Sequence, residues 1–283
     1  MIETWRWFGP TDKVTLSDIR QTGASGIVTS LYHLEPGIVW KKEEISSRLI
    51  EITGSKSQPT HLSWEVVESL PVSETIKTGS HPRDEHIKAW IESMENLSEL
   101  GINVICYNFM PILDWTRTEL AAPMSSGATA MYFDLLDFIA FDCFILERIN
   151  AQNDYEKHLV DKAKNRFESF SKEKELLLTK NITAGLPGAG ENLTFGEVKT
   201  RLEGYSGIDA DKLRENFKYF LDAVVPTAEK LGVRLCCHPD DPPWPLLGLP
   251  RIMSTEEDYN WLVNIHPSNC LLYTSPSPRD RVQ

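Results

Sequence analysis

"DADKLRENFKYFLDAVVPTAEKLGVRLCCHPDD", residues 209–241, decides the fold class of this chain. Residues 209–231 carry apolar side chains at helical spacing, and Gly232 marks the end of the predicted helix. The apolar segment that follows, 233–239, has the length of a buried strand and contains His238 near its end. A helix that stops at a glycine and leads directly into a strand is part of a βαβ unit, so this stretch predicts a parallel sheet with helices packed on it.

The chain repeats this order of elements. A second predicted helix ends at Gly101 and also leads directly into an apolar segment. Strands are predicted over residues 4–9, 26–33, 61–69, 102–110 and 233–239. The stretch between the fourth and fifth strands reads mainly as helix, and we expect a helical insertion over about 118–205 because this stretch is too long for a simple crossover. The predicted class is α/β, with about five strands in a parallel sheet.

Polar residues stand where the predicted strands end. In an α/β barrel, the carboxyl ends of the strands surround the active site. The residues at these strand ends are Trp5, Arg6, Tyr32, His33, Glu68, Tyr107, Asn108, His238 and Asp240. Of these, we select Arg6, His33, Glu68, Asn108, His238 and Asp240 as candidates for the chemistry. Because the carboxyl ends of all the strands lie on the same side of such a barrel, we expect these residues to form one polar site.

Composition excludes several classes of function. The net charge is −12 and no basic cluster occurs, so a nucleic-acid partner is not expected. The most apolar stretch, residues 131–149, is interrupted by Asp134, Asp137 and Asp142, and so we expect no membrane span. The N-terminus lacks the features of a signal peptide, and five irregularly spaced cysteines suit reduced thiols. A cytoplasmic globular protein is expected.

Three stretches resemble one family. They are "TWRWFGPTDKVTLSDIRQTGASGIVTSLYHLEPGIVW" (4–40), "YNFMPILDWTRTEL" (107–120) and "HPDDPPWPLLGLPRIMST" (238–255), which together are similar to mannonate dehydratases of hexuronate degradation. The resemblance runs over residues 1 to about 270. It implies a xylose-isomerase-like TIM (β/α)8 barrel and a lyase that dehydrates D-mannonate to 2-keto-3-deoxy-D-gluconate with Mn²⁺ or Fe²⁺.

The resemblance also implies a metal site. The histidine of the family's HPDDPP motif is a metal ligand, and His238 stands at the matching position. The other family ligands are a cysteine in a Cys-(Thr/Ser)-Gly motif, a histidine in His-Leu-Arg and the aspartate of Arg-Pro-Asp-His-Gly, whose histidine serves in proton transfer. None of these later motifs occurs in this sequence, so the catalytic histidine has no counterpart here.

The last residues depart from the family. "LLYTSPSPRDRVQ" (271–283) contains the repeat Ser-Pro-Ser-Pro, which is typical of a loop, and it does not match the family's sixth strand. We therefore expect residues 1–270 to form a partial barrel domain and residues 271–283 to be a foreign, unstructured tail of a truncated or chimeric chain. Barrel strands six to eight and most of the metal ligands would then be absent.

The residues at the end of the fifth strand have two interpretations each. A neutral imidazole suits Mn²⁺ or Fe²⁺ as one ligand among several, and the family resemblance favours this role for His238 over that of a strand-end histidine with ordinary hydrogen bonds. Asp240 could orient His238 through its second nitrogen, or bind sugar hydroxyls, or cap the turn before Pro242. For Asp241 the turn is favoured.

The remaining candidates also keep an alternative. Arg6 could bind the substrate carboxylate, or it could be a surface arginine stacked on a neighbouring tryptophan. His33 and Asn108 could contact sugar hydroxyls or make ordinary loop hydrogen bonds. Glu68 could contact the substrate, act as general base or belong to a structural ion pair, and Arg117 could meet the carboxylate or be buried in such a pair.

The sequence thus predicts a metal-dependent hydro-lyase whose ligand is a small sugar acid, D-mannonate. Two alternatives remain: a sugar or sugar-acid isomerase or epimerase of the same barrel class, and an inactive fragment. A homo-oligomer is left open, and neither a nucleic acid nor a membrane is expected as a partner.

Overall fold

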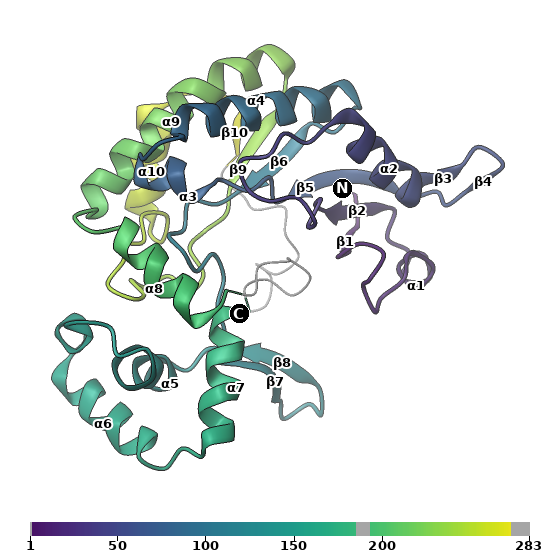
Figure 1. Cartoon of the computed structure of the whole chain (residues 1–283). Coiled ribbons are helices and arrows are strands. Elements are labelled where there is room, and N and C mark those ends of the chain that lie inside the picture. Colours follow the sequence, from purple (N-terminus) through teal and green to yellow (C-terminus); the bar gives the residue numbers. More distant parts are fainter. Residues whose placement is uncertain (1, 185–192, 273–283) are drawn as a thin grey trace. The chain divides into compact units, whose positions relative to one another are not determined.

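The computed structural model describes residues 2–184 and 193–272 (Figure 1). The chain divides into two compact units. Among the described residues, unit 1 comprises 2–109, 210–239 and 252–272, and unit 2 comprises 110–184, 193–209 and 240–251. In this part of the chain, no helix combines the length and the apolar character needed to cross a membrane.

Unit 1 is built on a six-stranded sheet in the order β1-β2-β5-β6-β9-β10, in which every neighbouring pair is parallel. Its strands are β1 (Thr4–Arg6), β2 (Gly26–Thr29), β5 (Ser63–Glu68), β6 (Val104–Tyr107), β9 (Arg234–Cys237) and β10 (Leu271–Leu272). The five predicted strands are all present, which confirms the α/β class with a parallel sheet. The described residues contain a sixth strand, β10, which pairs with β9. Leu271 and Leu272 are the first two residues of the tail predicted to be unstructured, so that prediction was wrong for these two; the rest of it, 273–283, lies outside the described residues.

Helices of unit 1 follow the strands along the chain. They are α1 (Leu16–Gln21), α2 (Lys42–Thr53), α3 (Glu74–Thr78), α4 (Arg83–Glu99), α9 (Ala210–Leu231) and α10 (Glu256–Ile265), and a small ribbon joins β3 (Gly54–Ser55) to β4 (Gln58–Pro59). The stretch that predicted the fold forms α9 and β9 as expected. Gly232 between them has a φ of 69°, a left-handed conformation that glycine adopts without steric cost.

Helices α4 and α9 cover one face of the sheet (Figure 1). The ring of Tyr107 on β6 packs at 6.1 Å from Trp90 of α4 and at 5.8 Å from Phe220 of α9, measured between ring centroids. Because successive side chains of a strand point to opposite faces, Cys106 lies on the other side of the sheet from Tyr107. Glu68 and Cys236 share the face of Cys106, since they are its register partners on the neighbouring strands.

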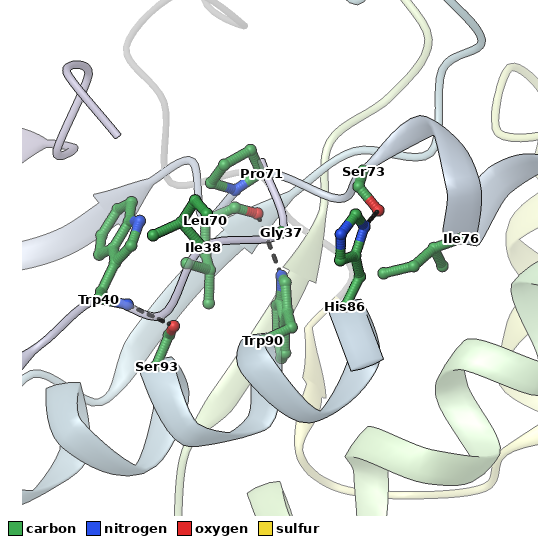
Figure 2. A pocket seen from close by; sticks show the side chains of 10 residues that line it. All are labelled: Gly37, Ile38, Trp40, Leu70, Pro71, Ser73, Ile76, His86, Trp90 and Ser93. Carbon is green, nitrogen blue, oxygen red and sulfur yellow. Dashed lines mark hydrogen bonds between the residues drawn. The ribbon is translucent and has the colours of Figure 1, made fainter. Parts of the chain in front are cut away.

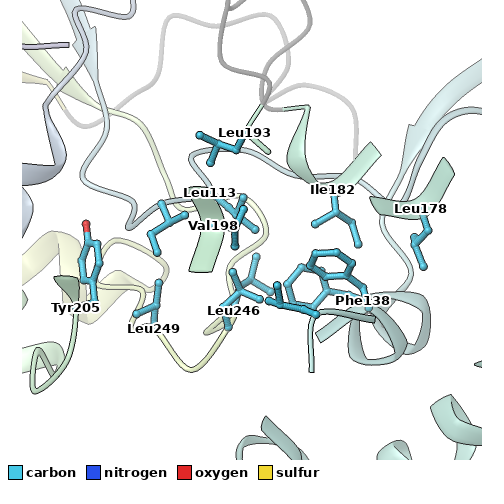
Figure 3. Packing of buried hydrophobic residues seen from close by; sticks show 13 residues of the cluster. Leu113, Phe138, Leu178, Ile182, Leu193, Val198, Tyr205, Leu246 and Leu249 are labelled. Atoms are coloured by element: carbon cyan, nitrogen blue, oxygen red, sulfur yellow. The ribbon is translucent and has the colours of Figure 1, made fainter. Parts of the chain in front are cut away.

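Unit 2 contains the predicted insertion. Its elements are the antiparallel ribbon of β7 (Glu119–Pro123) and β8 (Thr129–Tyr132), and then α5 (Leu135–Ala140), the π-helical turn η1 (Phe141–Ile145), the 3-10 turn η2 (Ala151–Asp154), α6 (Lys157–Phe167), α7 (Lys172–Thr183) and α8 (Phe195–Gly204). The sequence pattern predicted the helices of this segment but not the ribbon. The loop after β9, residues 240–251, contains four prolines and is called the proline-rich loop below. An apolar cluster brings Phe138 of α5 and Ile182 of α7 together with Leu246 and Leu249 of this loop (Figure 3).

Candidate active site

Four of the predicted site residues lie at the carboxyl edge of the sheet in unit 1, on the face opposite α4 and α9. Arg6 pairs with Val28, and Val28 with Val66, which places Arg6 on the face of Glu68 two residues further along β5. The His238 N–H donates to the Tyr107 carbonyl oxygen at 2.7 Å and so continues the ladder between β6 and β9.

This continuation places the remaining two candidates. Asn108 and His238 follow Cys106 and Cys236 by two residues and therefore share their side of the sheet. Both side chains are buried. We call Arg6, Glu68, Asn108 and His238 the strand-end cluster.

Arg6 and Glu68 form a buried ion pair within this cluster. Arg6 Nη1 contacts Glu68 Oε1, and the two side chains are 7% and 0% exposed. Arg6 Nη2 also donates to the backbone carbonyl oxygen of Glu68 at 3.3 Å. Desolvation alone would lower the pKa of Arg6, but the neighbouring Tyr32 and Glu68 outweigh it and raise that pKa. A structural ion pair was one of the interpretations of Glu68 from the sequence, and the structure shows this pair. The interpretation of Arg6 as a surface residue was wrong, because Arg6 is buried.

His238 is held in a defined orientation. Its Nδ1 lies 2.7 Å from the carbonyl oxygen of Pro239, which can only accept, so Nδ1 carries the proton. In the neutral ring the lone pair then belongs to Nε2, the form in which an imidazole binds a metal ion. His238 therefore fits the role of one ligand. In the part of the chain that the structure describes, no three His, Cys, Asp or Glu side chains gather to hold a metal.

Cys106, the register partner of Glu68 on the same face of the sheet, is a packing residue whose thiol keeps its proton. It is one of five buried cysteines, none of which forms a disulfide within the described residues. Cys106 and Cys236 are register partners on β6 and β9, and the hydrogen bond between their thiols, together with burial, raises the pKa of Cys106 well above its usual range. A thiol in this state is neither a good nucleophile nor a metal ligand at neutral pH.

His33 does not join the strand-end cluster. Its side chain is 53% exposed, and its Nε2 lies 3.0 Å from Glu44 Oε2 on α2. The neighbouring Tyr32 is half-buried, and its hydroxyl donates to the Glu68 carbonyl oxygen at 3.4 Å. Among these two residues, the polar group at the carboxyl edge of β5 is therefore Tyr32.

Arg117 lies in unit 2, where it forms a two-point ion pair with Asp241. Its Nη1 and Nη2 each donate to one carboxylate oxygen at 2.8 Å, and its guanidinium lies 4.4 Å from the ring centroid of Trp115. Trp115 also bridges to Asp241 through the backbone. Of the two interpretations of Arg117, the structure shows the ion pair. Asp241, expected to cap a turn, is its partner.

Asp240 also has an arginine neighbour in unit 2. Arg251 Nη1 lies 3.9 Å from Asp240 Oδ1, both side chains are 2% exposed, and Arg251 Nη2 donates to the Leu113 carbonyl oxygen at 2.8 Å. Burial lowers the pKa of Arg251, and the charges of Asp240 and Asp114 oppose this shift. Sequence reasoning missed Arg251, although a cation directly after a proline-rich loop with two aspartates was a signal for it.

Comparison with known proteins identifies the family. The family model described as D-mannonate dehydratase (UxuA) matches residues 1–276. The chain belongs to the D-mannonate dehydratase family. This confirms the family predicted from the sequence.

Relatives of this family cover nearly the whole chain. A mannonate dehydratase of Rhizobium meliloti (strain 1021) is 47% identical over 263 residues, which are 93% of this chain and 64% of the relative. Mannonate dehydratase 1 of Agrobacterium fabrum is 49% identical over 259 residues, 92% of this chain and 63% of the relative. This chain therefore spans slightly less than two thirds of the length of these two proteins.

A solved structure has a similar fold. The crystal structure of mannonate dehydratase from Streptococcus suis serotype2 matches with a TM-score of 0.68 and 30% sequence identity. The match covers 95% of this chain and 62% of that one. The fold of the described residues is thus that of this family.

A small pocket of unit 1 lies apart from the strand-end cluster (Figure 2), on the helix-covered side of the sheet. Trp40, Leu70 and Trp90 provide much of its apolar wall, and the Trp90 Nε1–H donates to the Leu70 carbonyl oxygen at 3.4 Å. His86 Nδ1 lies 2.9 Å from Ser73 Oγ at the other end. The imidazole of His86 and the indole N–H of Trp90 are thus both engaged by other residues of the wall, and we assign this pocket no role in the chemistry of the family.

Proposed function

We propose that this chain takes part in the dehydration of D-mannonate to 2-keto-3-deoxy-D-gluconate in hexuronate degradation. The family match over residues 1–276 and relatives named mannonate dehydratase support this proposal. The observation that carries it is the gathering of Asn108, His238 and the Arg6–Glu68 pair at one edge of a parallel sheet. That edge is where parallel α/β folds bind their ligands.

We further propose that the sheet belongs to a xylose-isomerase-like TIM barrel. Six adjacent parallel strands, helices that follow them along the chain, and the likeness to the Streptococcus suis structure support this. A cytoplasmic location is proposed because five buried cysteines that form no disulfide within the described residues suit a reducing compartment.

Dehydration of a sugar acid requires removal of the proton next to the carboxylate and loss of the hydroxyl on the next carbon. The step is accelerated by a base, by an acid for the leaving oxygen and by positive charge near the carboxylate. Asn108 is proposed to bind sugar hydroxyls, because its amide both donates and accepts hydrogen bonds. The carboxylate of Glu68 is proposed to be the negatively charged group of the cluster, and the guanidinium of Arg6 neutralises it.

A metal ion is part of the proposal. Mn²⁺ or Fe²⁺, when bound, would supply positive charge for the substrate carboxylate. We assign His238 as one ligand, since its Nδ1–H is taken by the Pro239 carbonyl and the lone pair of the neutral ring belongs to Nε2. Asp240 is not assigned a metal role, because it lies against Arg251.

Calorimetric binding of D-mannonate to the purified chain in the presence of Mn²⁺ tests the proposed substrate. D-mannitol is the matched control, because it has the same pattern of hydroxyls but no carboxylate. We expect D-mannonate to bind and D-mannitol to bind at least tenfold more weakly. Equal binding of the two, or binding of neither, would contradict the proposal.

Product analysis tests the reaction. We expect the product formed from D-mannonate to be lighter than the substrate by one water. A product of unchanged mass would support an isomerase or epimerase instead.

A further inference from the structure

Tyr32 follows β2 and stands beside His33 among the predicted strand-end residues, but the sequence assigned it no role. The Tyr32 hydroxyl donates to the Glu68 carbonyl oxygen at 3.4 Å, and Arg6 Nη2 donates to the same oxygen at 3.3 Å. The phenol and the guanidinium therefore lie side by side, since they share one acceptor. A carbonyl oxygen has two lone pairs, and these two donors use both.

Arg6 and Glu68 are poorly placed to contact a ligand themselves. Their side chains are 7% and 0% exposed, and their charges neutralise each other. Tyr32, in contrast, is only half-buried, so part of this residue is accessible to a ligand. Cys106, the register partner of Glu68, lies beneath the pair as a protonated thiol.

The ring of Tyr32 is supported from a second strand end. Its centroid lies 5.7 Å from that of Phe8, which follows β1, and the guanidinium of Arg6 lies 5.0 Å from the same Phe8 ring. Phe8 thus contacts both Tyr32 and Arg6. These contacts fix the position of the phenol at the carboxyl edge of β1, β2 and β5.

We propose that Tyr32 is a substrate-contacting residue that hydrogen-bonds a hydroxyl of a sugar acid, and that Arg6 is a positioning residue acting through it. This inference rests on the proposed function, because the sugar acid is the ligand of the same edge. A phenol suits such a ligand, since its hydroxyl both donates and accepts and its ring packs against the C–H groups of a sugar.

The geometry explains why Tyr32 can respond to a ligand. At 3.4 Å its hydrogen bond to the Glu68 carbonyl is long, so a ligand oxygen at a normal distance would be a better partner. Arg6 keeps its own bond to that carbonyl, and so the oxygen remains satisfied when the phenol turns to the ligand. His33, the residue predicted for this role, is instead engaged with Glu44 at the surface.

Substitution Tyr32→Phe tests the inference, because it removes the hydroxyl and keeps the ring. We expect the dissociation constant for D-mannonate, measured by calorimetry, to rise about tenfold, the loss expected for one hydrogen bond. The thermal midpoint and near-ultraviolet circular dichroism of the variant check that the fold is kept. Tyr219→Phe is the matched control: it removes a phenol hydroxyl that bonds Asp84 on the surface of unit 1, and its affinity should equal that of the unchanged chain.

Spectra of the tyrosines separate this inference from the proposed function. In ¹³C-tyrosine-labelled protein, the signal missing from the Tyr32→Phe spectrum should shift when D-mannonate is added and not with D-mannitol. If D-mannonate binds while that signal and the Tyr32→Phe affinity stay unchanged, the inference is wrong and the proposed substrate stands. If only another sugar acid, such as D-gluconate, binds and shifts the signal, the contact stands and the proposed substrate is wrong. If no sugar acid binds, or if His33→Gln weakens binding more than Tyr32→Phe does, the inference is overturned.

Discussion

Arg117 and Asp241 are joined by two parallel hydrogen bonds, Nη1 to Oδ1 and Nη2 to Oδ2, each 2.8 Å long. The pair links two segments of unit 2 that lie 124 residues apart in the sequence. Asp241 belongs to the HPDDPP motif. Because its carboxylate is paired with Arg117, this residue of the motif holds two segments of unit 2 together. A two-point pair of this kind fixes geometry as well as contributing energy.

We predict that Arg117→Met lowers the free energy of unfolding by about 2 kcal/mol, because the half-buried Asp241 carboxylate loses two charge-assisted hydrogen bonds. Urea denaturation measures the change, and Arg117→Met/Asp241→Asn gives the coupling in a double-mutant cycle. Loss of D-mannonate binding with no loss of stability would instead indicate that Arg117 contacts the ligand.

The Arg6–Glu68 pair should behave as a buried ion pair. Arg6→Met leaves a fully buried carboxylate without its cation, and we expect a cost of roughly 3–5 kcal/mol in the free energy of unfolding. Arg6→Met/Glu68→Gln should recover part of that cost, because neither charge then remains. If the double variant is as unstable as the sum of the single variants, measured by urea denaturation, the two residues do not interact as described.

Asp258 makes stability depend on pH in the acid range. Burial raises the pKa of this carboxyl, but hydrogen bonds from Arg214 and from the N–H groups of Ser254 and Thr255 outweigh burial and lower the pKa below its usual value. A depressed pKa in the folded state means that the stabilisation is present above the unfolded pKa of about 3.9 and is lost as the pH falls through the folded value.

We therefore expect the free energy of unfolding to decrease as the pH falls below about 4, and we expect Asp258→Asn to reduce this pH dependence. Urea denaturation at a series of pH values measures both. Asp18→Asn on α1 is the matched comparison: hydrogen bonds from Thr15 also lower the pKa of Asp18, but its carboxylate is exposed, so we expect a smaller change in the pH dependence than for Asp258→Asn. An unchanged pH dependence in Asp258→Asn would refute the prediction.

The tautomer of His238 can be observed directly. Because Nδ1 lies 2.7 Å from the Pro239 carbonyl oxygen, we expect the neutral ring to carry its proton on Nδ1. Long-range ¹H–¹⁵N correlation spectra distinguish the two tautomers, and His238→Gln assigns the signal. A proton on Nε2 would place the lone pair on Nδ1 and remove the basis for assigning His238 as a ligand through Nε2.

Gly248 is required by close packing in the loop of unit 2. Its φ is 70°, and a Cβ at this position would lie 2.7 Å from Arg148 Nη1 and 2.8 Å from Asp154 Oδ2. We expect Gly248→Ala to cost roughly 1–3 kcal/mol in the free energy of unfolding, from backbone strain and displaced side chains. Gly204→Ala on α8 is the control, because a Cβ there meets nothing within 4 Å and alanine favours the helix. Equal stability of the two variants would contradict the prediction.

Much of unit 1 could be predicted from the sequence. Short apolar segments predicted the strands, and in two cases an amphipathic helix that ends at a glycine comes directly before the strand. These are local signals, and they were enough to predict the parallel sheet. Since parallel strands place their carboxyl ends at one edge, the same pattern predicted that Arg6, Glu68, Asn108 and His238 would gather. The two-residue strand β10 was missed because it is too short to show a pattern.

By itself, then, the sequence determined the family, the positions of five strands along the chain and four of the residues that reach the edge of the sheet, because each of these depends on a local sequence pattern. Only the tertiary structure decided which charge meets which: Arg6 with Glu68, Arg117 with Asp241 and Arg251 beside Asp240. It also placed Tyr32 rather than His33 at the Glu68 carbonyl. These choices depend on strand register and on the path of the chain beyond each strand, which bring together groups far apart in the sequence and which no local pattern specifies.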